Sequence, residues 1–271
     1  MSNDSNADFG RRLDLRLLSL VYNEFLAELD LQESDRQSLE DRGLNSEQIR
    51  AGSFKSVSYG SSIDVLSSML ERFSASEILS VPGFVTDRDN GHITTTVSDG
   101  LLIPVFSAQG HVRAIQVRTD GSPKYKWLSG GPAGSIGSPV HFPVAAQPVS
   151  WRGGVVQITE GPLKAHVATT LGDVPTIGIA GVGAWRSVLH VFESKGPYGD
   201  LNRPDKVVVS FDQDWVSNKT VRASRRDLIR ALGELHLDVA VGEWPEEYKG
   251  IDDALAAGVD IVYRDVNPAQ I

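Results

Sequence analysis

The stretch VVQITEGPLKA, residues 155–165, decides the fold that this chain is expected to adopt. It opens with a short β-branched apolar run, which predicts a buried strand. Glu160 stands at the carboxyl end of that strand, and Gly161 follows it. Pro162 suits the first turn of a helix, and a helical pattern then continues to Leu171. A strand, a tight turn and a helix with a carboxylate at the junction indicate an open parallel sheet, in which sites lie at the carboxyl ends of strands.

A second acidic stretch follows another predicted strand. KVVVSFDQDW, residues 206–215, is an apolar run that ends in Asp212 and Asp214. Because alternate residues of an extended segment share a face, we expect both carboxylates to point to the same side. Strand patterns near 174–179 and 237–242 complete a predicted set of four strands that alternate with helical patterns.

A third acidic stretch, KGIDDAL at residues 249–255, has Asp252 and Asp253 at the start of a predicted helix. An Asp in that position is often only a helix cap, and for Asp252 alone the two interpretations are equally good. Glu160 alone is better explained as a turn carboxylate. The three stretches together nevertheless predict a metal-phosphate site, because Mg²⁺ or Mn²⁺ prefers oxygen ligands and takes carboxylates together with phosphate and water.

The composition is that of a globular protein without disulfides. The chain has 271 residues, enough for one large or two small domains, with 41% hydrophobic and 23% charged residues. It has no cysteine, so disulfides and cysteine zinc sites are excluded. No apolar run reaches membrane-spanning length and the N-terminus lacks the apolar core of a signal peptide, so we expect a cytoplasmic protein with no membrane partner.

The distribution of charge is more informative than its total. The net charge of −9 argues against a protein that coats nucleic acid over its whole surface. Residues 101–150, however, carry four basic groups and one acidic group, a local net charge of +3. This positive segment lies just before the acidic stretches. A local basic patch can be the footprint of a nucleic acid on an otherwise acidic protein.

Residues 1–100 are expected to form a helical region. Helical patterns recur at 11–29, 34–44, 45–50 and 61–80. Residues 82–100 are rich in Gly, Asp and Thr and predict a loop or hairpin. Nothing in residues 1–80 indicates chemistry.

Residues 101–150 are expected to form a basic, β-rich subdomain. Two strands are predicted on either side of a turn at Gln109-Gly110, and Lys124 and Lys126 lie on one face of a further strand. From spacing alone, a hairpin with a solvated lysine pair is the better interpretation of this last strand. GGPAGSIG is not a nucleotide-binding Walker A loop, because no Gly-Lys-Ser/Thr follows it.

The ordered set of acidic motifs resembles the Toprim domain of bacterial-type DNA primases, type IA and type II topoisomerases and several small nucleases. That family has a strand with a Glu-Gly turn and then a strand with Asp-x-Asp. Glu160 matches the first motif, and Asp212 and Asp214 match the second. GIAGVGAW, residues 178–185, resembles the glycine-rich end of the family's second strand. The resemblance covers about residues 153–260.

A second resemblance lies in front of the first. GHVRAIQVRTDGSPKYKWLSG, residues 110–130, looks like the part of primase catalytic cores that precedes their Toprim domain. In primases this basic subdomain and the Toprim face form the cleft for template and nucleotides. By matching position, Arg118, Lys124, Arg113 and Lys126 are implied to bind nucleic acid or nucleotide. The arrangement is also similar to primase-like Toprim proteins of plasmids and phages.

The resemblance implies an architecture and a reaction. The expected α/β fold has a Toprim-like parallel sheet flanked by helices at residues 151–271, preceded by a smaller α+β subdomain formed by regions 1–100 and 101–150. The implied reaction is metal-dependent nucleotidyl transfer, making primers on single-stranded DNA during DNA replication. Nucleoside triphosphates and a replicative helicase are the further implied partners. A Toprim nuclease and a catalytically silent nucleic-acid-binding module remain as alternatives.

The resemblance also assigns roles to the acidic residues. The implied metal ligands are Glu160, Asp212, Asp214, Asp252 and Asp253. Glu160, Asp212, Asp214 and Lys164 are the implied catalytic residues. Glu160 binds a metal or accepts the proton of the attacking hydroxyl, and Lys164 contacts phosphate or neutralises carboxylates. The chain departs from replicative primases in having no cysteine zinc module and in having Gln213 where many primases have glycine.

Overall fold

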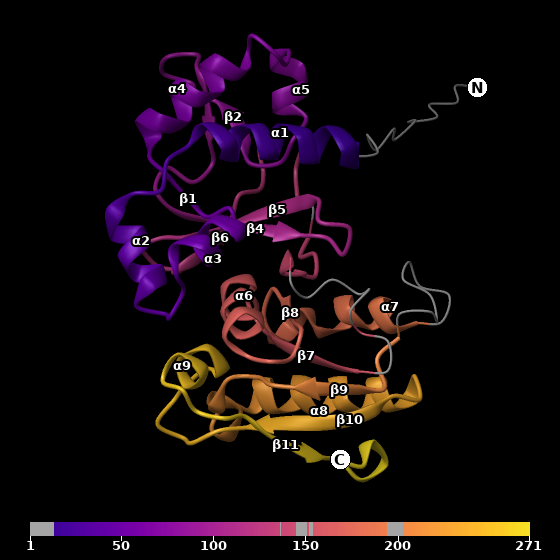
Figure 1. Ribbon diagram of the computed structural model, residues 1–271. Helices are drawn as coiled ribbons and strands as arrows, with labels where there is room; N and C mark the ends of the chain where they lie inside the picture. The colour runs from indigo at the N-terminus through magenta and orange to yellow at the C-terminus, as the bar shows by residue number, and fades with distance from the viewer. Residues whose placement is uncertain (1–13, 136, 145–150, 152–153, 194–202) are drawn as a thin grey trace, which may run out of the picture.

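The molecule has two lobes, each built around its own β-sheet (Figure 1). The computed structural model describes residues 14–135, 137–144, 151, 154–193 and 203–271. The N-terminal lobe contains an antiparallel sheet, and the C-terminal lobe contains a mainly parallel one. Among these residues, no helix has the length and apolar character needed to span a bilayer.

The helices of the N-terminal lobe are short and capped by their own sequence. They are α1 (Leu15–Glu28), α2 (Glu33–Glu40), α3 (Ser46–Ala51), α4 (Tyr59–Met69) and α5 (Ala75–Leu79). Asn45, Ser58 and Ser74 each cap a helix through a reciprocal capping box, which satisfies backbone N–H groups that the first helical turn leaves free. The predicted helical patterns in this region are therefore confirmed.

The N-terminal sheet has the strand order β1-β4-β5-β6. Its strands are β1 (Lys55–Val57), β4 (Gly100–Phe106), β5 (Val112–Arg118) and β6 (Tyr125–Trp127). A separate hairpin pairs β2 (Phe84–Thr86) with β3 (Ile93–Thr95), in the segment where a loop or hairpin is predicted. Gly110 has φ +78° at the tight turn between β4 and β5, where a side chain would be strained.

The structure does not separate the helical region from the basic region as the sequence suggests. Strand β1 pairs with β4, so a segment of the expected helical region forms an edge of the sheet in the basic region. One hydrophobic core also includes residues from Leu18 to Leu128. The helices and the basic strands thus belong to one lobe. The expected boundary at residues 150–151 adjoins positions that lie outside the described residues.

The C-terminal lobe confirms the predicted parallel sheet. Its strands are β7 (Val155–Glu160), β8 (Thr176–Ile179), β9 (Lys206–Val209), β10 (Asp238–Glu243) and β11 (Val262–Asp265). Their order is β11-β10-β9-β7-β8, and all neighbours are parallel except β11, an antiparallel edge strand. The helices are α6 (Pro162–Leu171), α7 (Leu189–Phe192), α8 (Lys219–Glu234) and α9 (Ile251–Ala256). Short 3₁₀ helices are η3 (Val182–Val188), η5 (Gln213–Val216) and η6 (Pro268–Gln270).

The two faces of this sheet differ in chemistry. Alternate strand residues such as Val156 and Ile158 pack in one apolar core with residues of η3, α7 and α8. The other face buries polar side chains between the central strands. Gln157 donates to Ser210 Oγ at 2.5 Å, and Thr159 Oγ1 donates to the carbonyl oxygen of Ser210 at 2.9 Å. These internal hydrogen bonds remove most of the cost of burying the polar groups.

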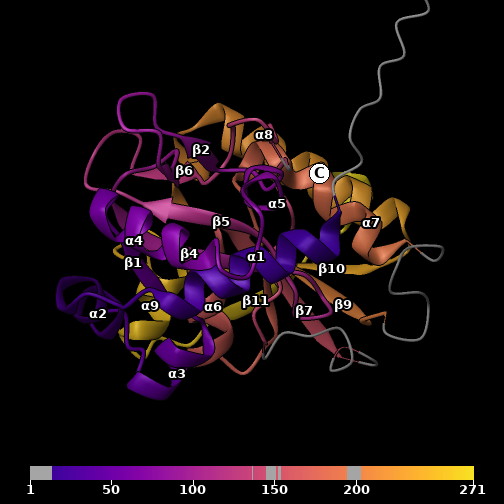
Figure 2. The same ribbon diagram turned by 90° about the horizontal axis from the view of Figure 1, so that it is seen from above.

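The lobes are joined by a hydrophobic core of their own. Leu163 and Val167 of α6 pack against residues of α2, α3 and β4, among them Leu39 and Ile103. Figures 1 and 2 show α6 lying between the two sheets, beneath α2 and α3. His141 adds a backbone link, because its N–H and carbonyl pair with Gly178 at the end of β8. The lobes therefore form one packed unit.

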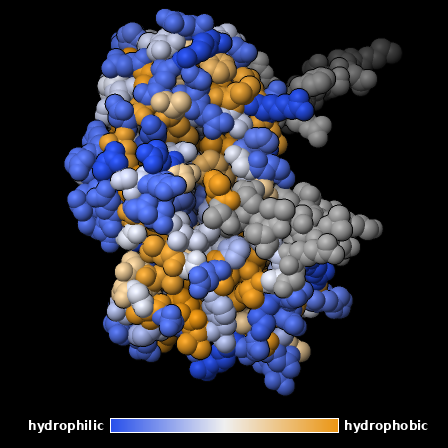
Figure 3. All heavy atoms as spheres, viewed as in Figure 1, coloured by the Kyte–Doolittle hydropathy of each residue, from blue (hydrophilic) through white to orange (hydrophobic). Residues whose placement is uncertain are grey.

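The surface mixes polar and apolar residues. Figure 3 shows hydrophilic and hydrophobic residues interspersed over the visible face of both lobes. Leu20 and Val262 are two of the exposed apolar side chains. Scattered apolar residues are normal on protein surfaces, so they do not by themselves indicate an interface.

The core between the lobes can be tested with Leu163→Ala. Leu163 is buried, and removing three side-chain carbons there should lower the free energy of unfolding by about 2–5 kcal/mol, the usual cost of a core leucine. Urea unfolding followed by far-ultraviolet circular dichroism measures the change. The matched control is Leu20→Ala, because Leu20 is exposed and should cost less than about 0.5 kcal/mol. Equal stabilities of the two variants would contradict the packing described for α6.

Candidate active site at the carboxyl edge of the parallel sheet

Three segments bring acidic side chains to one edge of the parallel sheet. Glu160 is the last residue of β7, Asp212 follows β9, and Asp252 lies in the first turn of α9. Strands β7 and β9 are direct neighbours, so the residues that follow them meet at the same edge. Gly161 has φ +84°, which lets the chain turn from β7 straight into Pro162 at the start of α6.

The structure corrects the predicted geometry of the Asp-x-Asp motif. Strand β9 ends at Val209, and Asp212 is the cap of the 3₁₀ helix η5, which contains Asp214. The chain leaves the sheet because long-range contacts redirect it: Gln213 N–H donates to the carbonyl oxygen of Lys249 at 3.0 Å. The two carboxylates therefore do not share a strand face. They still flank Glu160, whose Oε1 accepts a hydrogen bond from Asp212 N–H at 3.2 Å.

Helix α8 holds the turn that carries Asp214. Arg222 donates to the carbonyl oxygens of Trp215 and Val216 at the end of η5. The guanidinium of Arg225 lies over the Trp215 ring, 4.3 Å from its centre, and burial lowers the Arg225 pKa. These arginines are therefore occupied in fixing the position of Asp214 relative to α8.

Lys164 is the cation at the centre of the cluster. It lies one helical turn after Glu160, and its Nζ donates to both carboxylate oxygens of Asp212. Burial opposes the lysine charge, but the Asp212 carboxylate outweighs that effect and raises the Lys164 pKa. Lys249 Nζ lies 3.9 Å from the same carboxylate at the surface. The sequence-based expectation that Lys164 neutralises carboxylates agrees with this geometry.

Asp252 is paired with a residue of the other lobe. Arg42 Nη1 donates to Asp252 Oδ2 at 2.5 Å, and the Asp252 side chain is only 1% exposed. Burial raises the Asp252 pKa despite the cations Lys164 and Arg42 nearby. The sequence analysis found no chemistry in residues 1–80 and missed Arg42. No local pattern could have revealed it, since its partner is 210 positions away.

Gly250 shows how tightly these groups converge. A Cβ atom at Gly250 would collide with Asp252 Oδ1 and would lie 3.2 Å from Lys164 Nζ and 3.4 Å from Asp212 Oδ1. Only glycine fits this position without displacing them. Asp253, by contrast, is exposed, and its Oδ2 accepts a hydrogen bond from Gly250 N–H at 3.2 Å. The structure therefore places Asp253 as a cap of α9 and outside the cluster.

Glu160 has the most altered acidity of the cluster. Burial, together with the negative charge of Asp212, raises the pKa of Glu160 to about 7. Burial is the larger of these two causes. A carboxyl group that titrates near neutral pH can exchange a proton with substrate under ordinary conditions.

A cavity of about 180 Å³ connects this cluster with the N-terminal sheet. It is lined by Glu160 and Lys164 from the C-terminal lobe and by Gln116 and Tyr125 from β5 and β6. Gly181, after β8, lies on its wall, as the glycine-rich motif at that strand end suggests. The acidic cluster and the basic strands thus face one space.

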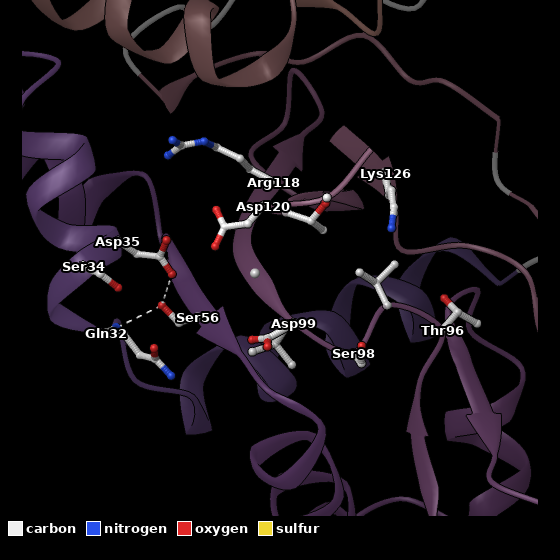
Figure 4. Close-up of a pocket in the computed structure, with 15 residues that line it drawn as sticks. Gln32, Ser34, Asp35, Ser56, Thr96, Ser98, Asp99, Arg118, Asp120 and Lys126 are labelled. Carbon is white, nitrogen blue, oxygen red and sulfur yellow. Dashed lines mark hydrogen bonds between the residues drawn. The ribbon is translucent and has the colours of Figure 1, made fainter. Parts of the chain in front are cut away.

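The four predicted basic residues are not gathered in that cavity. Arg113 Nη1 donates to the carbonyl oxygen of Leu15 at 3.0 Å, so Arg113 points to α1. Arg118 Nη1 donates to Ser38 Oγ at 2.5 Å, Lys124 is exposed, and Lys126 points into a second cavity (Figure 4). The structure brings Tyr125 to the cavity beside Glu160, whereas none of these four cations lines it.

The acidic cluster contains carboxylate oxygens that a divalent cation could bind. Among the described residues, no three acidic or histidine side chains already stand in an arrangement that would coordinate a metal. Asp214 Oδ1 and Asp252 Oδ1 are nevertheless buried without a hydrogen-bond partner. Unpaired buried carboxylate oxygens are costly, and a hard cation is a partner that satisfies them. The donor set, all carboxylate oxygens, suits Mg²⁺ or Mn²⁺ better than softer metals.

Comparison with known sequences gives one family. Residues 153–261 match the family described as "Domain of unknown function (DUF3854)", which covers less than half of the chain. No curated protein matches the sequence. The matched residues belong to the C-terminal lobe and include β7 to α9, but the match ends just before β11.

Solved structures of bacterial primases have the same fold as this chain. The Aquifex aeolicus primase, with its zinc-binding and RNA polymerase domains, is 15% identical with a TM-score of 0.69. That match covers 91% of this chain but only 62% of the Aquifex chain. The RNA polymerase domain of Mycobacterium tuberculosis primase DnaG has the same identity and TM-score, with 92% and 83% covered. A DnaG catalytic domain bound to single-stranded DNA is 15% identical, with a TM-score of 0.64 and coverages of 90% and 75%.

The raised pKa of Glu160 predicts a pH-dependent stability. The folded protein binds this proton more tightly than the unfolded chain, whose Glu pKa is 4.5, so metal-free stability should fall as pH rises from about 4.5 to about 7. Glu160→Gln keeps the shape but cannot ionise, and the variant should lose this component. Thermal melting in chelator between pH 4.5 and 8 measures the difference between the two proteins. A pH profile that is identical in both proteins would contradict the assigned acidity.

Proposed function

We propose that this chain, which has the fold of a primase catalytic core, synthesises primers on single-stranded DNA by metal-dependent nucleotidyl transfer. The observation that carries the proposal is that Glu160 and Lys164, which both hydrogen-bond with Asp212, line a cavity that Tyr125 of β6 also lines. Side chains suited to phosphoryl transfer and a surface that could bind a DNA strand thus lie next to each other. The DnaG catalytic domain with a similar fold was solved bound to single-stranded DNA, which supports the choice of ligand.

The proposed metal ligands are Glu160, Asp212 and Asp214, with Asp252 beside them. A bound Mg²⁺ or Mn²⁺ would supply Lewis-acid stabilisation of negative charge on the phosphate oxygens. Ion binding requires Lys164 to release at least one oxygen of Asp212, which a long and flexible side chain can do. Asp253 is left out of this set, because its carboxylate caps α9.

The reaction places specific demands on the protein's own side chains. The 3′-hydroxyl of the growing strand attacks the α-phosphorus of a nucleoside triphosphate, and pyrophosphate leaves. Where Glu160 does not bind the cation, it is placed to accept the proton of the attacking hydroxyl, because it lies beside Asp212 and lines the cavity. Lys164, once it turns from Asp212, and Lys249 at the surface bind phosphate oxygens.

The template is proposed to cross the hairpin of β5 and β6. Arg118, Lys124 and Lys126 supply positive charge along that path, while Gln116 and Tyr125 line the catalytic cavity. Arg113 is left out, since its guanidinium contacts α1. A replicative helicase and a cytoplasmic location belong to the same proposal, and both follow from the resemblance to primases.

One incubation separates primer synthesis from the alternatives. Protein, Mg²⁺ or Mn²⁺, labelled nucleotides and single-stranded DNA give extension products if the chain is a primase core. Shortened DNA would indicate a Toprim nuclease, because the same carboxylates can activate water. Retained DNA without any product would indicate a silent binding module.

Substitution of the acidic cluster tests the assignment of roles. Asp212→Asn removes a ligand charge with little change of volume, so it should abolish incorporation and weaken Mn²⁺ binding while the fold is kept. Glu160→Gln should reduce incorporation by about 10²–10⁴-fold, the usual contribution of general base catalysis, with a smaller effect on Mn²⁺ affinity. Calorimetric Mn²⁺ titration and the incorporation assay measure both effects.

The matched control for these two variants is Asp260→Asn, which removes the same charge at an exposed position. It should incorporate nucleotides like the wild type. Wild-type incorporation by Asp212→Asn would refute the assigned site. Absence of Mn²⁺ binding in the unmodified protein would support the silent-module alternative.

The positive charges of Arg118 and Lys124 predict a salt-dependent contribution to the binding of single-stranded DNA. Arg118→Ala combined with Lys124→Ala should weaken binding of single-stranded DNA and lower the slope of log affinity against log salt by about 1.4, or about 0.7 for each lost phosphate contact. Fluorescence anisotropy between 50 and 200 mM salt measures both quantities. Arg16→Ala, an exposed cation on α1, is the control and should leave the slope unchanged. An unchanged slope in the double variant would make these residues ordinary surface charges.

A further inference from the structure

The N-terminal lobe contains a second cavity, and Arg118 and Lys126 of the proposed template path lie on its wall. Its volume is about 530 Å³, within the range of roughly 300–1,000 Å³ found for small-molecule sites. The start of α2, strand β1, residues 96–100 and the ends of β5 and β6 form its walls (Figure 4). Val57 and Val97, both buried, give it an apolar floor. A space of this size can hold a nucleotide.

The cavity has a positive side and a negative side. Lys126 points into it from β6, and Arg118 lies at its upper rim (Figure 4). Carboxylates from three other segments line the remaining wall: Asp35, Asp99 and Asp120. Within the part of the chain that the structure describes, the side chains of Asp99, Asp120 and Lys126 form no hydrogen bond or ion pair, although the Lys126 main chain pairs with Val117 in the sheet. Their charges therefore remain available for a ligand that carries both an anionic group and hydrogen-bond donors.

Part of the negative wall is held in place by internal hydrogen bonds. Ser56 Oγ donates to Asp35 Oδ2 at 2.6 Å and accepts from Gln32 N–H at 2.9 Å (Figure 4). Ser56 is buried, so this chain of contacts fixes the Asp35 carboxylate before any ligand arrives. A wall with fixed acceptors costs less to organise on binding than a flexible one.

Strands β5 and β6 contribute residues to both cavities. Arg118 on β5 is the backbone partner of Tyr125 on β6, and Tyr125 lines the catalytic cavity together with Glu160. Lys126, the next residue, opens to the other side of the same strand because successive side chains alternate. A DNA strand that passes Tyr125 toward the acidic cluster would therefore run along β6, the short strand that also supplies Lys126 to the second cavity.

We propose that this second cavity is a guanine-nucleotide subsite, in which Lys126 contacts phosphate and Asp99 and Asp120 accept hydrogen bonds from the base. The choice of a nucleotide rests on the proposed function. The choice of guanine rests on the carboxylates, because guanine alone among the four bases presents two adjacent donors, N1–H and the N2 amino group, to a two-oxygen acceptor. The nucleotide comes either from the template strand or from free solution.

The experiment measures base preference without turnover. Labelled thirteen-residue oligothymidylates with a single central G, A, C or T are titrated with the full chain, and anisotropy gives four affinities. The unmodified protein should bind the G oligonucleotide about tenfold more tightly than the T one, in the range of one bidentate base contact. Asp120→Asn and Asp99→Asn should abolish the preference while leaving affinity for pure oligothymidylate within about twofold. Lys126→Ala should weaken all four oligonucleotides alike.

The controls separate the source of the ligand and the role of charge. Asp89→Asn removes the same charge in the β2–β3 turn and should retain the preference for G. Calorimetric titration with guanosine monophosphate tests whether a free nucleotide binds the cavity. If the unmodified protein binds guanosine monophosphate and Asp120→Asn does not, the subsite takes a free nucleotide. No G preference in the oligonucleotides together with no guanosine monophosphate binding would overturn the proposal. A G preference that survives in both Asp99→Asn and Asp120→Asn would also overturn it.

The outcome is independent of catalysis. Asp212→Asn should keep the G preference, because Asp212 lies in the C-terminal lobe and does not line the second cavity. A protein that prefers G but incorporates no nucleotide would leave the subsite in place and refute primer synthesis. A protein that incorporates nucleotides but shows neither a base preference nor guanosine monophosphate binding would support primer synthesis and refute the subsite.

Discussion

Compensation of buried negative charge is the constraint on which the rest of this structure depends. Asp212 and Asp252 are almost fully buried at one edge of a sheet, where an unpaired carboxylate would cost several kcal/mol. Lys164 and Arg42 supply the compensating charges, one from the helix that follows the Glu-Gly turn and one from the opposite lobe. The path of α6 and the docking of the N-terminal lobe therefore both serve the same electrostatic requirement.

Much of the C-terminal lobe could be predicted because its signals are local. Each parallel strand is a β-branched run, and Glu160 follows the first of them directly, so its position at the sheet edge was predictable. Strand β1 was missed because three residues carry too little periodicity. The turn at Asp212 and the Arg42–Asp252 pair were missed because each depends on a partner that is distant in sequence, Lys249 in the first case and another lobe in the second.

The hairpin of β5 and β6 contributes side chains to two different cavities. Strand β6 is only three residues long, yet its alternation directs Tyr125 to the cavity beside Glu160 and Lys126 to the larger cavity of the N-terminal lobe. The sequence showed this alternation but not the existence of two cavities, because the second wall is formed by α2 and β1. Lysine residues that look like an ordinary solvated pair in the sequence thus lie in distinct surroundings.

The docking of α6 has a consequence for how this protein can be divided. The sequence family matches residues 153–261, which suggests a self-contained module. Cutting the chain there would uncover Leu163 and Val167 and would leave Asp252 without its arginine. The exposed apolar stripe would favour self-association, and the orphaned carboxylate would weaken the native state. Recombination between such proteins should therefore exchange both lobes together, even though the sequence match marks only one of them.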